Sequence, residues 1–351
     1  ALVCVLALAS PARAQAPQLD AVDLLLQRLE AALQAGDRDA FATLFAAAVS
    51  AEDVEDIAVN LLIPNAMRTV VRERDRAQLE GAPEGDGHRL VVEFFIETAR
   101  RARILTASLD LRRPADGAPD SWRIIGSEGL TSIEGLYRLN VSTATQFAAR
   151  DLVVEAEDFR LTLTDGTAFP VESEEGITGL VLIGRGEMRF SPTPVTERGQ
   201  LRIFSGAETL VAPFETAFVR MNPGDYTEHV LTDRLAPVAV DARQLRRAQE
   251  VFADESPNSF SLDLRDLSRD IWYLLPPSGD FLADVRTRRW GVLTFARTGA
   301  QAEDLTLFQR ARRRTVALYP SQAKLAARGR FYTDDALMEY DVLDYNIEAQ
   351  V

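Results

Sequence analysis

The sequence contains few of the residues that form reactive centres. Among its 351 residues there are one cysteine, Cys4, one lysine, Lys324, and two histidines, His88 and His229. A Walker-type phosphate loop and a Schiff-base lysine each need a lysine in a defined context, and neither that loop motif nor GxGxxG occurs. The sequence therefore argues against nucleotide-binding and lysine-dependent chemistry.

The two histidines do not form a metal site. His88 ends the acidic, glycine-rich stretch 84–88, which we interpret as a solvated loop. His229 follows Glu228 but has no second histidine nearby, and one histidine beside one glutamate is a poor zinc site. We therefore predict no catalytic residue, no metal site and no cofactor in this chain.

The charge balance limits the partners. The chain has 39 basic and 53 acidic residues and a formal net charge of −14. Phosphate contacts need clustered cations, so nucleic acid and anionic membrane surfaces are disfavoured as partners. A hydrophobic content of 46% and a charged content of 26% are typical of a packed globular protein.

The first residues resemble the end of a signal peptide. Residues 1–9 are an apolar run, and Ala12-Arg13-Ala14 precedes Gln15 as an A-x-A cleavage site would. The run is too short to span a bilayer. We interpret residues 1–14 as a signal peptide remnant and predict an exported bacterial protein, periplasmic or extracellular, whose mature form has no cysteine.

Residues 15–145 read as an α+β domain. Apolar residues at helical spacing predict a helix over 19–35, and shorter helices are expected at 39–46 and from 51 to about 62. Alternating residues then predict strands at 69–76, 89–97, 104–113 and from 122. Helices followed by an antiparallel meander indicate a helix-plus-sheet layout.

The stretches AGDRDAFATLF at 35–45 and SWRIIGSEGL at 121–130 give this domain a family resemblance. It resembles the nuclear transport factor two-like (SnoaL-like) cone fold, whose members include enzymes, pocket-bearing modules and structural modules. The resemblance implies a cone that encloses an apolar pocket, with core packing as the alternative fate of its aromatic residues. The candidate pocket-lining residues are Phe41, Phe45, Phe94, Phe95 and Trp122.

Residues 146–335 have the pattern of a mostly antiparallel β domain, sandwich-like or barrel-like. Short apolar runs alternate with turns, and 176–206 reads as two strands joined by a turn, the second at 200–204. A helix is expected at 242–252, and a seam near 236–256 would divide the region in two. A run of arginines forms either an anion contact or the solvated edge of a hairpin, and its candidates are Arg310, Arg312, Arg313 and Arg314.

Residues 336–351 read as the first strand of a further domain. The stretch YDVLDYNIEAQV at 340–351 is similar to the opening strands of the N-terminal β domain in the membrane alanine aminopeptidase (gluzincin) family. This resemblance implies a non-catalytic accessory region of a larger exported zinc peptidase, whose partners are its own C-terminal domains. That family needs HExxH and a downstream glutamate, which are absent here, so the zinc and the catalytic residues would lie beyond residue 351.

Two further hypotheses remain open. A stand-alone periplasmic module could bind a peptide or small ligand, or act as a scaffold, through an apolar pocket in the first domain. A carbohydrate-binding or adhesive β module would instead need exposed aromatic residues, for which Trp272, Tyr273 and Trp290 are candidates. Burial of these three side chains would count against the carbohydrate hypothesis.

Overall fold

The structure is a computed structural model, and it describes residues 20–114 and 121–331. The protein is α+β with mostly antiparallel strands, as the sequence predicts. It forms two compact units: unit 1 is Ala1–Leu136 with Arg265–Arg269, and unit 2 is Tyr137–Leu264 with Asp270–Val351. The predicted signal peptide remnant and the predicted strand at 336–351 lie outside the described residues.

The first three helices of unit 1 are each started by a capping side chain. Asp20, Asp37 and Ser50 accept hydrogen bonds from backbone N–H groups of the first turn, which have no partner within the helix. Gly36 follows the first helix with φ of 65°, a left-handed conformation that glycine adopts readily. These helices are α1 (Ala21–Ala35), α2 (Arg38–Ala42) and α3 (Ala51–Leu61).

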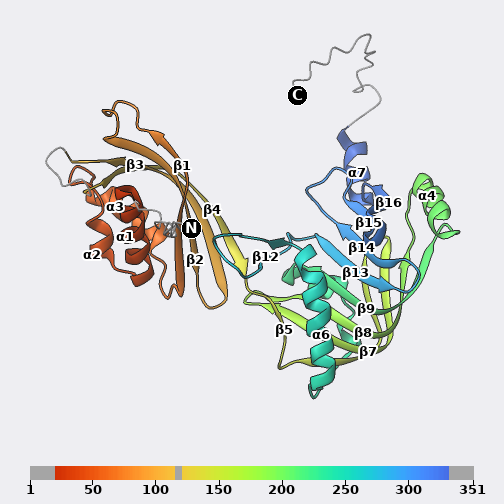
Figure 1. Cartoon of the computed structure of the whole chain (residues 1–351). Coiled ribbons are helices and arrows are strands. Elements are labelled where there is room, and N and C mark those ends of the chain that lie inside the picture. Colours follow the sequence, from red (N-terminus) through yellow and green to blue (C-terminus); the bar gives the residue numbers. More distant parts are fainter. Residues whose placement is uncertain (1–19, 115–120, 332–351) are drawn as a thin grey trace, which may run out of the picture. The chain divides into compact units, whose positions relative to one another are not determined.

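An antiparallel sheet packs against these helices (Figure 1). Its strands follow chain order: β1 (Arg68–Gln78), β2 (Gly87–Glu97), β3 (Arg101–Arg112) and β4 (Arg123–Tyr137). Alternate residues of β2, namely Leu90, Val92, Phe94 and Ile96, are at most 1% exposed and join the helix side chains in one core. The period of two therefore places one face of the sheet under the helices.

The outer edge of β1 is covered by side chains of α1. The backbone N–H of Thr69 donates to Oε1 of Gln34 at 2.7 Å, and the N–H of Val71 donates to Oε2 of Glu30 at 2.8 Å. Unpaired edge groups invite pairing with other chains, so these two contacts protect the edge.

Unit 2 is dominated by one large antiparallel sheet. Its strand order is β10-β6-β7-β8-β9-β13-β14-β15-β16, with β5 beside β7, so most neighbours are also consecutive in sequence. Outside this large sheet, β11 (Ser261–Leu262) pairs with β12 (Trp272–Leu274). The sheet strands are β5 (Asn140–Val141), β6 (Gln146–Ala156), β7 (Phe159–Ser173), β8 (Gly176–Phe190), β9 (Leu210–Met221), β10 (Leu235–Val238), β13 (Phe281–Thr287), β14 (Gly291–Arg297), β15 (Leu305–Gln309) and β16 (Arg314–Tyr319).

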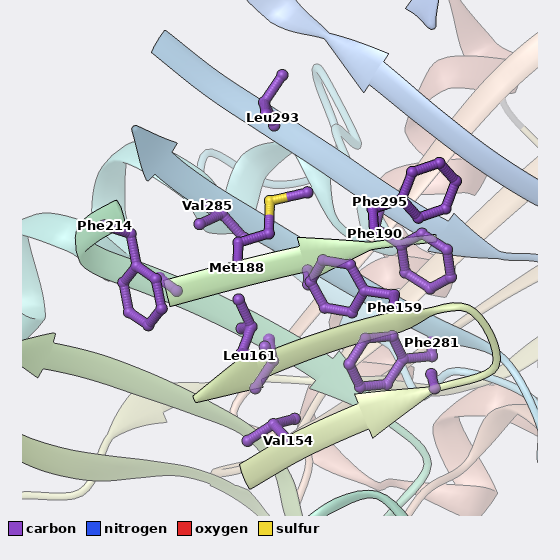
Figure 2. Packing of buried hydrophobic residues seen from close by; sticks show 14 of the residues in the cluster. Val154, Phe159, Leu161, Met188, Phe190, Phe214, Phe281, Val285, Leu293 and Phe295 are labelled. Carbon is purple, nitrogen blue, oxygen red and sulfur yellow. The ribbon is translucent and has the colours of Figure 1, made fainter. Parts of the chain in front are cut away.

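Aromatic side chains fill one face of this sheet. Phe159 stacks on Phe295 with ring centroids 4.5 Å apart and nearly parallel planes, and Phe190 and Phe281 tilt against the same ring at 6.0 and 6.2 Å. Figure 2 shows these rings with Met188 and neighbouring aliphatic side chains in one cluster. All four rings are fully buried, so this face is a packed core.

The opposite face of the sheet carries α6 (Ala242–Glu255), in the region predicted as a helix. The ring of Phe252 meets the ring of Phe218 on β9 edge to face, with centroids 5.7 Å apart. Ala248 is fully buried in the same contact. Unit 2 therefore has apolar layers on both sides of its central strands.

The prediction for 176–206 is wrong in its second half. The first part is one continuous strand, β8, and the second is a helix, α4 (Val195–Ser205), where a strand was expected at 200–204. Glu197, Gln200 and Arg202 are favourable helix residues, and Pro194 occupies the N-cap position. The helix buries only Leu201. The closely spaced apolar residues Leu201, Ile203 and Phe204 therefore did not indicate a strand.

Two central strands, β9 and β13, were not predicted. In β9, Pro213 counts against a strand interior, although the chain accommodates it opposite Glu187 beside a register shift. In β13, Asp284 interrupts the apolar run, yet it is 1% exposed. The remaining helical segments are η1 (Pro223–Asp225), α5 (Tyr226–His229), η2 (Thr232–Arg234), η3 (Ser256–Asn258), η4 (Arg310–Arg312) and α7 (Gln322–Phe331).

Candidate functional site

A cavity of about 940 Å³ lies in unit 1. This volume is within the range of about 300–1,000 Å³ that small-molecule sites occupy. The cavity is bounded by the segment after α2, the β1–β2 turn, the end of β3 and the start of β4. Its lining residues are Phe45, Ala46, Ala47, Ala48, Pro83, Asp86, Arg112, Arg113, Pro114, Arg123 and Ile125.

The segment after α2 is held against β4 by backbone hydrogen bonds. The N–H of Ala46 donates to the carbonyl of Ile124 at 2.9 Å, and the N–H of Ile124 donates to the carbonyl of Leu44 at 3.0 Å. Ala46, Ala47 and Ala48 then follow, and each contributes only a methyl group to the cavity wall. The alanines therefore leave space where larger side chains would fill it.

The β1–β2 turn forms a second wall and is tightly closed. The N–H of Leu79 donates to the carbonyl of Gly87 at 3.1 Å, and a Cβ on Gly87 would lie 2.5 Å from the Cβ of Ala82. Asp86 accepts from two nitrogens of Arg113, one of them Nε at 3.1 Å. These contacts fix Asp86 and Pro83 at the cavity.

Three arginines line the cavity, and their environments differ. Arg113 is paired with Asp86 and lies 5.9 Å above the ring of Trp122. Arg123 is half-buried and donates from Nη1 to the carbonyl of Trp122 at 2.9 Å. Arg112 is exposed at the end of β3. Within residues 20–114 and 121–331, neither Arg112 nor Arg123 makes an ion pair with a carboxylate.

A second cavity of about 620 Å³ adjoins the first and shares Arg112 and Ile125 with it. Its arginine, Arg89, donates to both carboxylate oxygens of Asp110 at 2.6 and 2.7 Å. These hydrogen bonds raise the pKa of Arg89, so its charge is firmly held by Asp110. The charge of Arg89 is therefore already paired within the protein.

The structure separates the five aromatic candidates. Only Phe45 lines the cavity, and its ring lies 5.2 Å from that of Phe41. Phe41, Phe94 and Trp122 belong to the core between the helices and the sheet. Phe95 is fully buried, and strand alternation places it on the face of β2 opposite Phe94.

His88 lies on β2 and not in a loop, so this prediction is wrong. It pairs in register with Leu111 on β3, and its ring stacks on Trp122 with centroids 4.9 Å apart. The strand begins two residues earlier than predicted because Gly87 closes the turn. His88 is thus fixed by packing beside the cavity without lining it.

The four arginines of the run in unit 2 lie in different environments. Arg310 ion-pairs with Glu255 and Asp284 at 2.5 and 2.6 Å, in a largely buried network. Arg313 adopts a left-handed turn with φ of 48°, and Arg314 lies over the ring of Phe204 at 5.7 Å. Arg312 is exposed. The four side chains therefore do not converge on one anion contact.

The aromatic residues proposed for a carbohydrate platform do not form one. Trp272 is fully buried, and Tyr273 is 5% exposed with its hydroxyl 2.8 Å from that of Ser256. Trp290 is half-buried, stacks on Phe204 at 5.9 Å and lies under Arg289. Burial of the first two counts against the carbohydrate hypothesis.

His229 is buried in unit 2. Its Nδ1 is 2.8 Å from the carbonyl oxygen of Glu155, and its ring packs on Phe281 with centroids 4.9 Å apart. Across the part of the chain that the structure describes, no group of three or more histidine, cysteine, aspartate or glutamate side chains is arranged to hold a metal ion. None of the described helices is long and apolar enough to cross a membrane.

The sequence interpretation did not identify the arginines and alanines of the cavity. A usable signal was present, because Arg112 ends one strand and Arg123 begins the next. Adjacent strands of a meander place such residues at the same end of a sheet. Comparison with protein-family models, curated proteins and solved structures gives no match to this chain.

Proposed function

We propose that the protein binds a small ligand with an apolar body in the 940 Å³ cavity of unit 1. The observation that carries this proposal is the cavity itself, whose wall is apolar over most of its length and is built from backbone fixed by hydrogen bonds. Preformed, mostly apolar cavities with a few polar groups are the usual form of small-molecule sites.

A neutral apolar fluorophore tests the proposal. N-phenyl-1-naphthylamine should gain fluorescence with the wild-type protein, and the substitution Ala47→Trp should remove that gain because an indole would occupy the cavity. Ala47 is exposed, so the free energy of unfolding should change by less than about 0.5 kcal/mol. The matched control is Ala42→Trp, an exposed alanine of α2 that does not line the cavity.

The proposal fails if the wild-type protein leaves the fluorophore unchanged. It also fails if Ala47→Trp and Ala42→Trp both bind the fluorophore as the wild type does. A loss of binding in both variants, together with lower thermal stability, would show damage to the fold instead of occupation of the cavity. The Ala47→Trp result would then no longer support the proposal.

The accessory-region hypothesis is compatible with this proposal and stays a prediction. Its support is the resemblance of residues 340–351 to an aminopeptidase strand and the lack of a catalytic motif in the sequence. The test compares the complete gene product with residues 15–351, using zinc content by mass spectrometry and hydrolysis of chromogenic amino-acid substrates. Zinc and activity in the complete product alone would support it, and their absence from both would remove it.

A further inference from the structure

The charged groups of the cavity are not balanced. Among the described residues of the lining, three guanidinium groups face one carboxylate, that of Asp86. Arg113 takes that carboxylate and also donates to the carbonyl of Gly85 at 3.3 Å. Arg112 and Arg123 are left as two positive charges beside an apolar wall.

This imbalance is unusual in a chain with a net charge of −14. Other arginines of the same sheet have carboxylate partners: Arg89 pairs with Asp110, and Arg74 pairs with Glu93 at 2.6 Å. The chain has 53 acidic residues, yet two arginines of this cavity have no carboxylate partner among the described residues and give it a positive local charge, opposite in sign to the whole molecule. An anionic ligand would be attracted to this place.

The side chains define which anion fits. A guanidinium presents a planar fork of N–H donors that matches a carboxylate. Arg123 donates one hydrogen bond to a backbone carbonyl, and its other N–H groups can donate to a ligand. Because Arg123 is half-buried, water screens its interaction with a ligand only partly. The Asp86–Arg113 pair adds no net charge, so the positive charge of the described lining comes from two arginines, which suits one carboxylate better than a polyphosphate.

We infer that the ligand of this cavity is an amphipathic carboxylate, an inference that rests on the proposed function. Its carboxylate binds Arg123 and Arg112, and its apolar body lies against Phe45, Pro83 and Ile125. Arg113 does not bind the ligand directly, because Asp86 neutralises it.

Competition between matched ligands tests this inference. Decanoate and decan-1-ol share an apolar chain and differ in charge at pH 7.5, and each is titrated against bound N-phenyl-1-naphthylamine below its aggregation concentration. Decanoate should displace the fluorophore at a concentration about 10-fold lower than decan-1-ol does, since a hydrogen bond to a charged group strengthens binding by this factor or more. Added salt should weaken decanoate and leave decan-1-ol unchanged.

Three substitutions assign the roles of the charged residues. Arg123→Gln should weaken decanoate by about 10-fold and leave decan-1-ol unchanged, whereas Arg112→Gln should weaken decanoate only a few-fold because Arg112 is exposed. Asp86→Asn should strengthen decanoate a few-fold because it releases Arg113. Arg28→Gln removes an exposed charge of α1 away from the cavity and is the control for net charge.

The outcomes separate the inference from the proposed function. If decan-1-ol competes as well as decanoate, or if Arg123→Gln weakens both equally, the carboxylate assignment is wrong while the apolar site stands. If Arg28→Gln weakens decanoate as much as Arg123→Gln, the attraction belongs to the whole surface and the inference is also overturned. If the fluorophore does not bind at all, the proposed function fails with it.

Discussion

Arginines of the two units differ in their ion-pair partners. In unit 2, Arg310 lies between Glu255 and Asp284, whose side chains are 5% and 0% exposed. In unit 1, Arg112 and Arg123 face a cavity and have no carboxylate partner among the described residues. The same residue type therefore stabilises the fold in one unit and, in our proposal, binds a ligand in the other.

The difference follows from what surrounds each guanidinium. Asp284 accepts a hydrogen bond from the hydroxyl of Thr294 at 2.6 Å, and Nε of Arg310 donates to the same hydroxyl at 3.2 Å. Glu255 closes α6 and also pairs with Arg286 at 2.9 Å. A buried charge needs such partners because water cannot solvate it, whereas the cavity of unit 1 leaves its arginines in contact with solvent.

The largest expected effect comes from removing the central cation of unit 2. Arg310→Met should lower the free energy of unfolding by about 3–5 kcal/mol, because it leaves Glu255 and Asp284 buried without their shared partner. Urea unfolding measures this loss. Arg312→Met, at an exposed position of the same short helix, is the control and should change stability by less than about 0.5 kcal/mol. Equal effects in the two variants would contradict the role assigned to the network.

Local sequence patterns predicted the fold where one pattern dominated. The α1 helix has apolar residues at helical spacing, and the structure confirms its end before Gly36 but begins it at Ala21, two residues later than predicted. The β9 and β13 strands were missed because Pro213 and Asp284 interrupt them, and what permits these residues is distant in sequence. Asp284 is tolerated only because Arg310 and Thr294 reach it.

The candidate site was harder to predict than the fold. Aromatic residues were proposed for the pocket because they are large and apolar, but Phe41 and Phe94 pack into the core for the same reason. The cavity exists where Ala47 and its neighbours are small, and its charge comes from arginines at two strand ends. An unfilled space is a property of the three-dimensional arrangement, so a pattern of large residues does not reveal it.

An intermediate effect is expected from the pH dependence of Asp284. Burial raises the pKa of Asp284 to about 6 from an ordinary value of 3.8, although Arg310 and Thr294 act in the opposite direction. Between these two values the folded protein keeps a proton that the unfolded chain releases. Stability from this group is therefore present below about pH 4 and is lost as the pH rises through about 6, by on the order of 3 kcal/mol.

Asp284→Asn isolates this contribution, because the amide does not titrate. Urea unfolding of both proteins between pH 4.5 and 7.5 should show the variant gaining stability relative to the wild type as the pH rises. Titration of all other carboxylates is common to both proteins and cancels in the difference. A difference that is constant across this range would show that Asp284 titrates outside it, against the assignment of a buried, destabilised charge.

The smallest expected effect concerns an exposed ion pair of unit 1. Arg38 on α2 pairs with Glu55 on α3, and their side chains are 58% and 53% exposed. Arg38→Gln should therefore cost only about 0.2–1 kcal/mol in urea unfolding, less at high salt, because water and ions screen the pair. A loss comparable to that of Arg310→Met would mean that exposure does not decide the value of these contacts. If the loss is small, unit 1 gains little from pairing its exposed arginines, and it costs Arg112 little to have no carboxylate partner among the described residues.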